Sequence, residues 1–185
     1  MEKYLELSDA VFVGGALTND IYKQKGFEVG ASLVSKNDEN LQETLKKIVQ
    51  NPKLIIPVDV TSSCDGQAPE FREPKNFQSN ECIVDAGPQT IEQIKKLLIG
   101  VKTIVWNGPI GNYEKGFGDK TERLAELIAE ATSSGAQSTV GGGDTLAAIN
   151  KLGLNDKFTF ISTGGGAMLD FLVNETLPGI EALEK

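Results

Sequence analysis

Two glycine triplets stand where bare backbone could bind an anion. The first, Gly141–Gly143, follows the β-branched run QSTV and leads into the alanine-rich segment 144–149. The second, Gly164–Gly166, follows the apolar run 158–161 and leads into an apolar segment from Ala167. Glycines between a strand and a helix leave N–H groups free to approach a phosphate. Neither triplet is followed by Gly-Lys-Ser/Thr, so neither is a Walker P-loop.

An acid directly follows the first triplet, because the stretch reads GGGDT and ends in Asp144 and Thr145. One interpretation makes Asp144 a helix N-cap, which is a common position for aspartate. The other makes it a ligand of Mg²⁺ bound to phosphates, since magnesium usually takes one or two carboxylates together with phosphate oxygens. A carboxylate beside a bound anion would repel it unless a cation lay between them. The residues alone leave both interpretations open.

The second triplet carries no acid, and Ser162 and Thr163 add hydroxyl donors before it. A helix start without a carboxylate suits a phosphoryl group that carries negative charge during transfer. Close packing of a helix on a strand is the alternative reason for these glycines.

The most specific stretch is 105–114, VWNGPIGNYE. Its Asn-Gly-Pro sequence predicts a rigid turn. A flat apolar slot could form from Pro109, Ile110 and Tyr113. Glu114 then has the right chemistry to accept hydrogen bonds from ribose hydroxyls, although the residue type alone fits a solvated surface acid equally well.

Composition removes several classes of function. The chain has no histidine, which excludes a Ser-His-Asp or Cys-His catalytic site within it. The net charge of −8 argues against non-specific binding to nucleic acid. No run of about 18 apolar residues is present, and the first residues, MEKYLELSD, are charged and unlike a signal peptide. We therefore expect a cytoplasmic protein that contacts neither membrane nor nucleic acid.

Apolar runs alternate with helical spacing along the whole chain. Strands are expected at 10–13, 53–60, 82–88, 102–106, 137–140 and 158–161, and helix faces at 41–49, 91–98 and 124–131. Residues 61–80 are polar and predict a long loop that could hold a hairpin. The alternation predicts an α/β fold, namely a three-layer Rossmann-like domain. Its mostly parallel sheet would have about six strands, helices on both faces, and a single domain spanning 1–185.

Every glycine cluster follows one of the expected strands. The clusters are Gly14-Gly15, Gly87-Pro88, the segment 107–111 and the two triplets. In open α/β sheets, ligands bind beyond the carboxyl ends of the strands. The sequence therefore predicts a binding site for a phosphorylated ligand at that edge.

The motifs WNGPIGNYE, GGGDT, STGGGAMLDFL and LPGIEAL, in this order and spacing, resemble those of phosphoglycerate kinase. The stretches FEVGASLV (27–34), LIIPVDV (54–60) and VDAGPQTI (84–91) resemble the same family. The likeness is to its C-terminal, nucleotide-binding half and covers essentially the entire chain. A Rossmann-type oxidoreductase is a poorer match, because VGGALTND lacks the G-x-G-x-x-G fingerprint.

The resemblance implies reversible phosphoryl transfer from 1,3-bisphosphoglycerate to ADP, giving 3-phosphoglycerate and ATP, with Mg²⁺ as the cofactor. It implies a monomer whose partner is an N-terminal, phosphoglycerate-binding lobe. We expect that lobe to be absent here and the chain alone to be inactive. A stand-alone nucleotide-binding or interaction module without catalysis is the alternative.

The resemblance also assigns residues. Gly14, Gly15 and Leu33 would border the adenine, with Gly87 near the nucleotide. The nucleoside pocket would contain Asn107, Gly108, Pro109 and Tyr113, and Glu114 would hold the ribose. Phosphates and magnesium would meet Gly142, Gly143, Asp144 and Thr145, with Asp144 as the metal ligand. The phosphoryl group in flight would face the catalytic glycines Gly164 and Gly165.

The first glycine cluster departs from the family pattern. Val13 stands where the family usually has the first of three glycines. Asn19 and Asp20 stand where it usually has aromatic residues.

Overall fold

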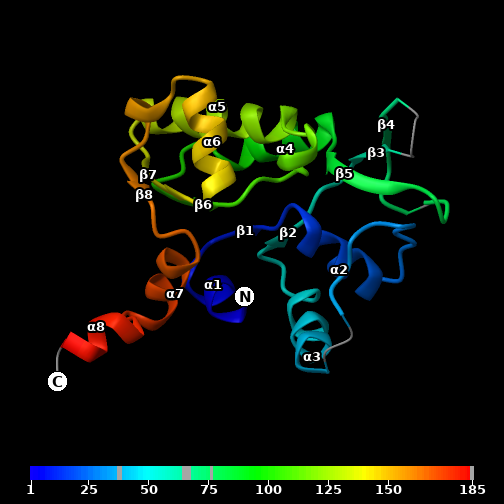
Figure 1. Ribbon diagram of the computed structural model, residues 1–185, viewed down its shortest axis with the longest axis horizontal. Helices are drawn as coiled ribbons and strands as arrows, with labels where there is room; N and C mark the ends of the chain where they lie inside the picture. The colour runs from blue at the N-terminus through cyan, green and yellow to red at the C-terminus, as the bar shows by residue number, and fades with distance from the viewer. Residues whose placement is uncertain (37–38, 64–67, 76, 184–185) are drawn as a thin grey trace. The chain divides into compact units, whose positions relative to one another are not determined.

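The computed structural model describes residues 1–36, 39–63, 68–75 and 77–183 (Figure 1). The chain forms two compact units. Unit 1 contains Met1–Lys96 and Pro109–Thr121, and unit 2 contains Leu97–Gly108 and Glu122–Lys185.

Unit 1 combines a parallel strand pair with a small antiparallel sheet. Strand β1 pairs in parallel with β2, and β3 pairs antiparallel with both β4 and β5. The elements are α1 (Glu2–Leu7), β1 (Val11–Phe12), α2 (Ala16–Gln24), α3 (Glu39–Ile48), β2 (Leu54–Ile55), β3 (Val60–Ser63), β4 (Glu70–Arg72), β5 (Cys82–Ala86), most of α4 (Pro88–Leu97) and the 3₁₀ helix η1 (Tyr113–Lys115).

Helical apolar spacing builds the core of unit 1. Leu45 and Ile48, three positions apart on α3, are both buried, which confirms the predicted helix face at 41–49. They belong to one cluster with Leu5 of α1, Val13 directly after β1, and Ile21 of α2. Helix α2 is thereby anchored between the first strand and α3.

The strand predicted over 53–60 is interrupted, so that prediction was wrong in its extent. Pro57 has no N–H to give to a strand ladder. Asp59 lies before β3, and its carboxylate accepts hydrogen bonds from the backbone N–H groups of Gln89 (2.9 Å) and Thr90 (2.7 Å) at the start of α4. The chain bends here because a buried carboxylate caps a helix that follows some 30 residues later.

The polar stretch 61–80 contains strands rather than one long loop. Strands β3 and β4 form an antiparallel pair, so the hairpin alternative is confirmed. The Arg72 guanidinium on β4 pairs with the buried carboxylate of Glu81 at 2.8 Å and with Glu70 at 2.9 Å. Long-range ion pairing thus orders a segment whose composition favours a loop.

Unit 2 contains a parallel sheet in the order β6-β7-β8. Its elements are β6 (Thr103–Asn107), most of α5 (Asp119–Ser133), β7 (Gln137–Gly141), α6 (Gly143–Lys151), η2 (Asn155–Lys157), β8 (Phe160–Ser162), α7 (Gly166–Asn174) and α8 (Pro178–Leu183). A helix crosses between successive strands, as parallel pairing requires. Figure 1 shows α7 and α8 leaving the sheet on the side opposite α5 and α6.

The predicted α/β class is confirmed, while the predicted sheet of about six strands was too large. In the described parts of the chain, the parallel pairs are β1 with β2, β6 with β7, and β7 with β8. Strand β5 pairs antiparallel with β3 instead of extending a parallel sheet. The single domain spanning 1–185 stays a prediction. No helix within the described ranges combines the length and apolar character needed to cross a bilayer.

Candidate functional site

The carboxyl ends of the three parallel strands of unit 2 lie side by side. Asn107, the last residue of β6, pairs with Gly141 at the end of β7, and Gly141 pairs with Ser162 at the end of β8. The loops 107–108, 141–143 and 163–166 therefore leave the sheet at one edge. We call these three loops the glycine edge. Both glycine triplets lie there, as the strand-to-helix pattern predicts.

Two hydrogen bonds join the three loops. The side-chain amide of Asn107 donates from Nδ2 to the carbonyl oxygen of Gly165 at 2.8 Å. The N–H of Gly108 donates to the hydroxyl of Thr145, which is fully buried in the first turn of α6, at 2.9 Å. The first bond joins the loop after β6 to the loop after β8, and the second joins it to the helix after β7.

Packing explains why glycine is needed at two of these positions. Gly142 has a φ of 98°, and a Cβ there would lie 2.9 Å from Oδ1 of Asn107. Gly165 has a φ of 45° and faces the Cα of Gly142. By contrast, nothing lies within 4 Å of a Cβ added to Gly143. The first two glycines are required by conformation or contact, whereas Gly143 leaves open space at the helix start.

Both helices begin without a side-chain cap. The N-cap of α6 is Gly142 and that of α7 is Gly165, and neither has a side-chain cap hydrogen bond. Uncapped N–H groups and the positive end of the helix dipole together favour an anion. Gly164, next to the second cap, is exposed and donates its N–H to Ser162 Oγ at 3.1 Å.

Asp144 is not the cap of α6, since Gly142 occupies that position. The structure thus decides against one of the two interpretations left open by the sequence. Asp144 lies in the first turn and is partly exposed, and among the described residues its carboxylate forms no hydrogen bond or ion pair. The described ranges contain no group of three or more His, Cys, Asp or Glu side chains suited to a metal ion. A single carboxylate fits only an ion that takes its other ligands from phosphates and water.

In unit 1 the first glycine pair packs against Pro109 and Ile110. The N–H of Gly15 donates to the carbonyl of Ile110 at 3.2 Å, and a Cβ on Gly14 would lie 2.7 Å from the Ile110 side chain. Gly15 has a φ of 65° and faces the carbonyl oxygen of Pro109. The structure therefore brings together Gly14, Gly15 and Pro109, which the resemblance assigns to the nucleoside.

Tyr113 and Glu114 lie on η1, within a tight loop. The N–H groups of Lys115 and Phe117 both donate to the carbonyl of Asn112, at 3.1 Å each. The N–H of Asn112 donates at 2.7 Å to the carbonyl of Val84 on β5. Glu114 is exposed and Tyr113 is partly buried. This loop rests against the middle of β5 and presents the Glu114 carboxylate to solvent.

A buried carboxylate missed at the sequence level supports the same loop. Asp85 on β5 is 5% exposed and accepts hydrogen bonds from the N–H of Ala86 (2.8 Å) and from that of Lys120 at the start of α5 (3.3 Å). A Cβ on Gly111 would overlap its carboxyl group. Burial is the main cause that raises the pKa of Asp85 to about 6, and the charge of nearby Asp119 acts in the same direction. The two backbone donors and the Lys120 charge act in the opposite direction. The signal in the sequence was an acid inside the apolar run CIVDAGP.

The remaining two predicted residues, Gly87 and Leu33, also belong to unit 1. Gly87 is buried, donates its N–H to the Asp59 carbonyl at 2.9 Å, and has no room for a Cβ beside the Asp59 carboxylate. Leu33 is 74% exposed. Its backbone carbonyl accepts a hydrogen bond from Asn19.

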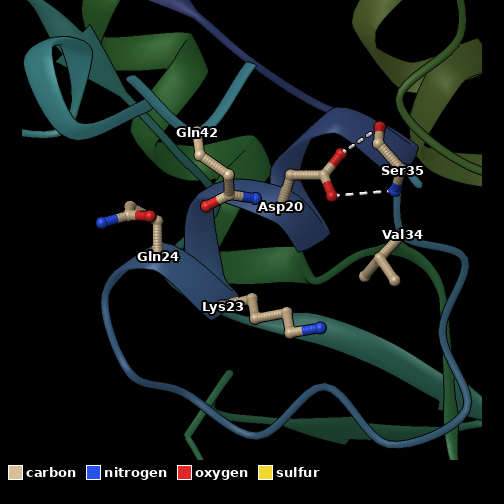
Figure 2. Close-up of a pocket in the computed structure, with 6 residues that line it drawn as sticks. All are labelled: Asp20, Lys23, Gln24, Val34, Ser35 and Gln42. Carbon is tan, nitrogen blue, oxygen red and sulfur yellow. Dashed lines mark hydrogen bonds between the residues drawn. The ribbon is translucent and has the colours of Figure 1, made fainter. Parts of the chain in front are cut away.

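A polar hollow of about 240 Å³ lies beside the segment that follows Leu33 (Figure 2). Helix α2, helix α3 and residues 34–35 line it with the side chains of Asp20, Lys23, Gln24, Val34, Ser35 and Gln42. None of the site residues predicted from the sequence lines this hollow. Both oxygens of Asp20 accept hydrogen bonds from Ser35, so its carboxylate serves the fold.

The fold and the glycine edge define an α/β protein of the kind that binds ligands beyond the carboxyl ends of parallel strands. The family model described as "Phosphoglycerate kinase" matches residues 1–175, and the chain belongs to that family.

The curated relatives extend well beyond this chain. A phosphoglycerate kinase of Chlorobaculum tepidum is 43% identical and aligns with 99% of this chain but 48% of its own length. One of Mannheimia succiniciproducens is 38% identical, over 100% of this chain and 48% of its own length. The chain thus spans about half the length of the curated relatives it matches.

Two solved structures show the same relation. Phosphoglycerate kinase from Coxiella burnetii aligns with a TM-score of 0.85 at 37% identity, covering 99% of this chain and 48% of that structure. The enzyme from Pyrococcus horikoshii aligns with a TM-score of 0.79 at 32% identity, over 99% and 47%. The fold of this chain is therefore that of about half of a phosphoglycerate kinase.

We predict that Gly142→Ala destabilises the protein by about 1–3 kcal/mol, because an alanine would adopt a disfavoured φ and press on the Asn107 amide. Gly143→Ala is the matched control and should change stability by less than about 0.5 kcal/mol, since its Cβ meets open space. Urea unfolding of both variants measures the difference. Equal effects of the two substitutions would contradict the packing described for the glycine edge.

We predict that Asp85 makes folding less favourable as the pH rises. Its pKa is about 6 in the folded protein and near its ordinary value of 3.8 in the unfolded chain. Between these values the folded state holds the proton more firmly, so this contribution is complete below about pH 4 and is lost as the pH passes 6. Two pKa units correspond to about 3 kcal/mol.

Asp85→Asn should remove this pH dependence, although it also loses an accepted hydrogen bond at every pH. We expect urea unfolding between pH 4.5 and 7.5 to show that the free energy of unfolding falls less steeply with pH in the variant than in the unmodified protein. Asp9→Asn, at an exposed acid of unit 1, is the control. Identical slopes for the unmodified protein and Asp85→Asn would contradict the prediction.

Proposed function

We propose that this chain is the ATP/ADP-binding domain of a phosphoglycerate kinase. The reaction is the glycolytic transfer of a phosphoryl group from 1,3-bisphosphoglycerate to ADP, giving 3-phosphoglycerate and ATP. One observation carries the proposal beyond family membership. Two uncapped helix N-termini, those of α6 and α7, follow neighbouring strands at the glycine edge. Such termini bind phosphate through backbone N–H groups.

The glycine edge is assigned to the phosphates. Gly142, Gly143 and Thr145 contribute the start of α6, and Gly164 and Gly165 contribute the catalytic backbone that faces the transferring phosphoryl. Phosphoryl transfer depends on positioning and on stabilisation of charge more than on covalent help. Backbone donors held by the Asn107 and Thr145 hydrogen bonds meet that need, because they need little rearrangement during the reaction.

Asp144 is assigned as the protein ligand of Mg²⁺. Its carboxylate is partly exposed in the first turn of α6 and has no partner among the described residues. The ion would neutralise phosphate charge when the nucleotide is bound. A metal between the carboxylate and the phosphates also removes the repulsion that an unpaired acid would exert.

The family resemblance assigns the following residues to the nucleoside: Gly14, Gly15, Leu33, Gly87, Asn107, Gly108, Pro109, Tyr113 and Glu114. Support comes from the packing of the first glycine pair on Pro109 and Ile110 and from the exposed carboxylate of Glu114. Glu114 would accept hydrogen bonds from ribose hydroxyls. Asn107 would act by fixing the neighbouring loops, since both ends of its amide face them.

The acceptor substrate is assigned to a separate N-terminal lobe, as the half-length match to the relatives suggests. A phosphorylated carboxylate needs a cluster of basic side chains. The chain has two arginines, and both are engaged with acids: Arg72 with Glu70 and Glu81, and Arg123 with Glu126 and Glu130. We propose that the chain is a cytoplasmic monomer and is inactive without that lobe.

Titration calorimetry with Mg-ADP tests the proposal. We expect weak binding, near millimolar, which corresponds to about −4 kcal/mol, and we expect it to require magnesium. No heat at any magnesium concentration would contradict nucleotide binding. A separately expressed N-terminal half from a relative should then restore phosphoglycerate kinase turnover. Binding without turnover in that mixture would favour the alternative of a nucleotide-binding module that has no catalysis.

We predict that Asp144→Asn removes most of the magnesium dependence of ADP binding and leaves the fold intact. Gly142 is the helix cap, so the loss of the carboxylate should not shorten α6. Calorimetry with and without magnesium, together with thermal melting, measures both effects. Asp156→Asn, at an exposed acid of unit 2, is the matched control. An unchanged magnesium dependence in Asp144→Asn would show that Asp144 is a surface acid and not a ligand of Mg²⁺.

A further inference from the structure

Two consecutive polar residues of α2 hold the segment around Leu33. Asn19 and Asp20 are both buried, at 3% and 7% exposure. Nδ2 of Asn19 donates to the Leu33 carbonyl at 2.8 Å. The N–H of Ser35 donates to one oxygen of Asp20 at 2.9 Å, and its hydroxyl donates to the other at 2.8 Å (Figure 2). We call these three hydrogen bonds the α2 clamp.

The α2 clamp holds the backbone that carries Leu33, whose own side chain is not buried. The Leu33 side chain is 74% exposed, so apolar packing contributes little to its position. Hydrogen bonds hold the backbone at residue 33 and at residue 35, on both sides of Val34. Two of them end on a buried carboxylate, and bonds of this charge-assisted kind are stronger than neutral ones. The hydrogen bonds of the α2 clamp thus hold a segment whose apolar Leu33 side chain is exposed to solvent.

The same helix fixes the first glycine pair. Gly15 is the N-cap of α2, and the Thr18 hydroxyl donates at 2.9 Å to the carbonyl of Val13, the residue directly after strand β1. Gly14 and Gly15 pack on Ile110 and Pro109. One helix therefore connects, within unit 1, the two segments assigned to the nucleotide base.

We propose that Asn19 and Asp20 are positioning residues that hold Leu33 as an apolar wall for the base of the nucleotide. The proposal rests on the proposed function for the contact between Leu33 and a base. Loss of the clamp should weaken ligands that carry a base and leave inorganic triphosphate binding unchanged.

The test has one part that needs no nucleotide. Hydrogen exchange of the full chain should show a protected amide at Ser35, because its N–H bonds to a buried carboxylate. Asp20→Ala should increase exchange in the peptide that contains residues 33–36 and leave other segments of the protein unchanged. Ser35→Ala removes only the hydroxyl donor and serves as a second variant should Asp20→Ala fail to fold. Unaltered exchange in both variants would overturn the clamp.

The second part measures ligands by calorimetry. We expect Asp20→Ala to weaken Mg-ADP by about tenfold, and Ser35→Ala by less, with affinity for magnesium tripolyphosphate changed less than about twofold. Ser35→Thr keeps both donors and should restore ADP affinity. Glu28→Gln, at an exposed acid of unit 1, is the control for charge alone.

Each combination of results has one meaning. Faster exchange with selective loss of ADP affinity supports the proposal. Faster exchange with unchanged ADP affinity, or with equal loss of ADP and tripolyphosphate, overturns the role of Leu33 as a wall for the base. An unmodified chain that binds tripolyphosphate but no ADP would also overturn that role. A chain that binds neither would overturn the proposed function, while the exchange data would still decide whether the clamp exists.

Discussion

The side-chain amide of Asn107 is the contact on which the glycine edge depends. Its Nδ2 donates to the Gly165 carbonyl, and its Oδ1 faces the space where Gly142 lacks a Cβ. An amide has one donor end and one acceptor end a fixed distance apart, so it sets the spacing of the loops on either side. The need for glycine at residue 142 follows from this spacing. Two uncapped helix starts then remain open at the sheet edge.

In unit 1, buried carboxylates hold loops in place, as the Asn107 amide does in unit 2. Asp20, Asp59 and Asp85 each accept backbone N–H groups from a distant segment, and so satisfy donors that no strand ladder reaches. The cost of burying such a charge is visible at Asp85, where burial raises the pKa to about 6. These acids fix irregular loops whose backbone N–H groups would otherwise need partners in regular secondary structure. Among the residues proposed to meet the nucleoside, Leu33, Gly87 and Tyr113 lie on or beside those loops.

The sequence predicted the features that arise from local pattern. Both strand–glycine–helix units were correct, because a β-branched run, a glycine triplet and an alanine-rich segment determine structure within about ten residues. The apolar face ending at Ile48 was correct for the same reason. The sequence did not predict the interruption at Asp59 or the role of Asp85, and it offered strand β4 only as part of a possible hairpin. These depend on partners 9 to 35 residues away, namely Glu81, Thr90 and Lys120, and no periodic pattern records such pairings.

Charge supports the proposal that catalysis needs more than the glycine edge. A helix N-terminus carries roughly half an elementary positive charge, so the starts of α6 and α7 together offer about one. A nucleoside triphosphate brings several negative charges into a chain whose own net charge is −8. Both arginines are engaged with acids, and we propose that a metal ion and basic groups of a separate N-terminal lobe supply the remaining positive charge. On this electrostatic argument, we propose that the glycine edge positions the phosphates and that their transfer needs those further cations.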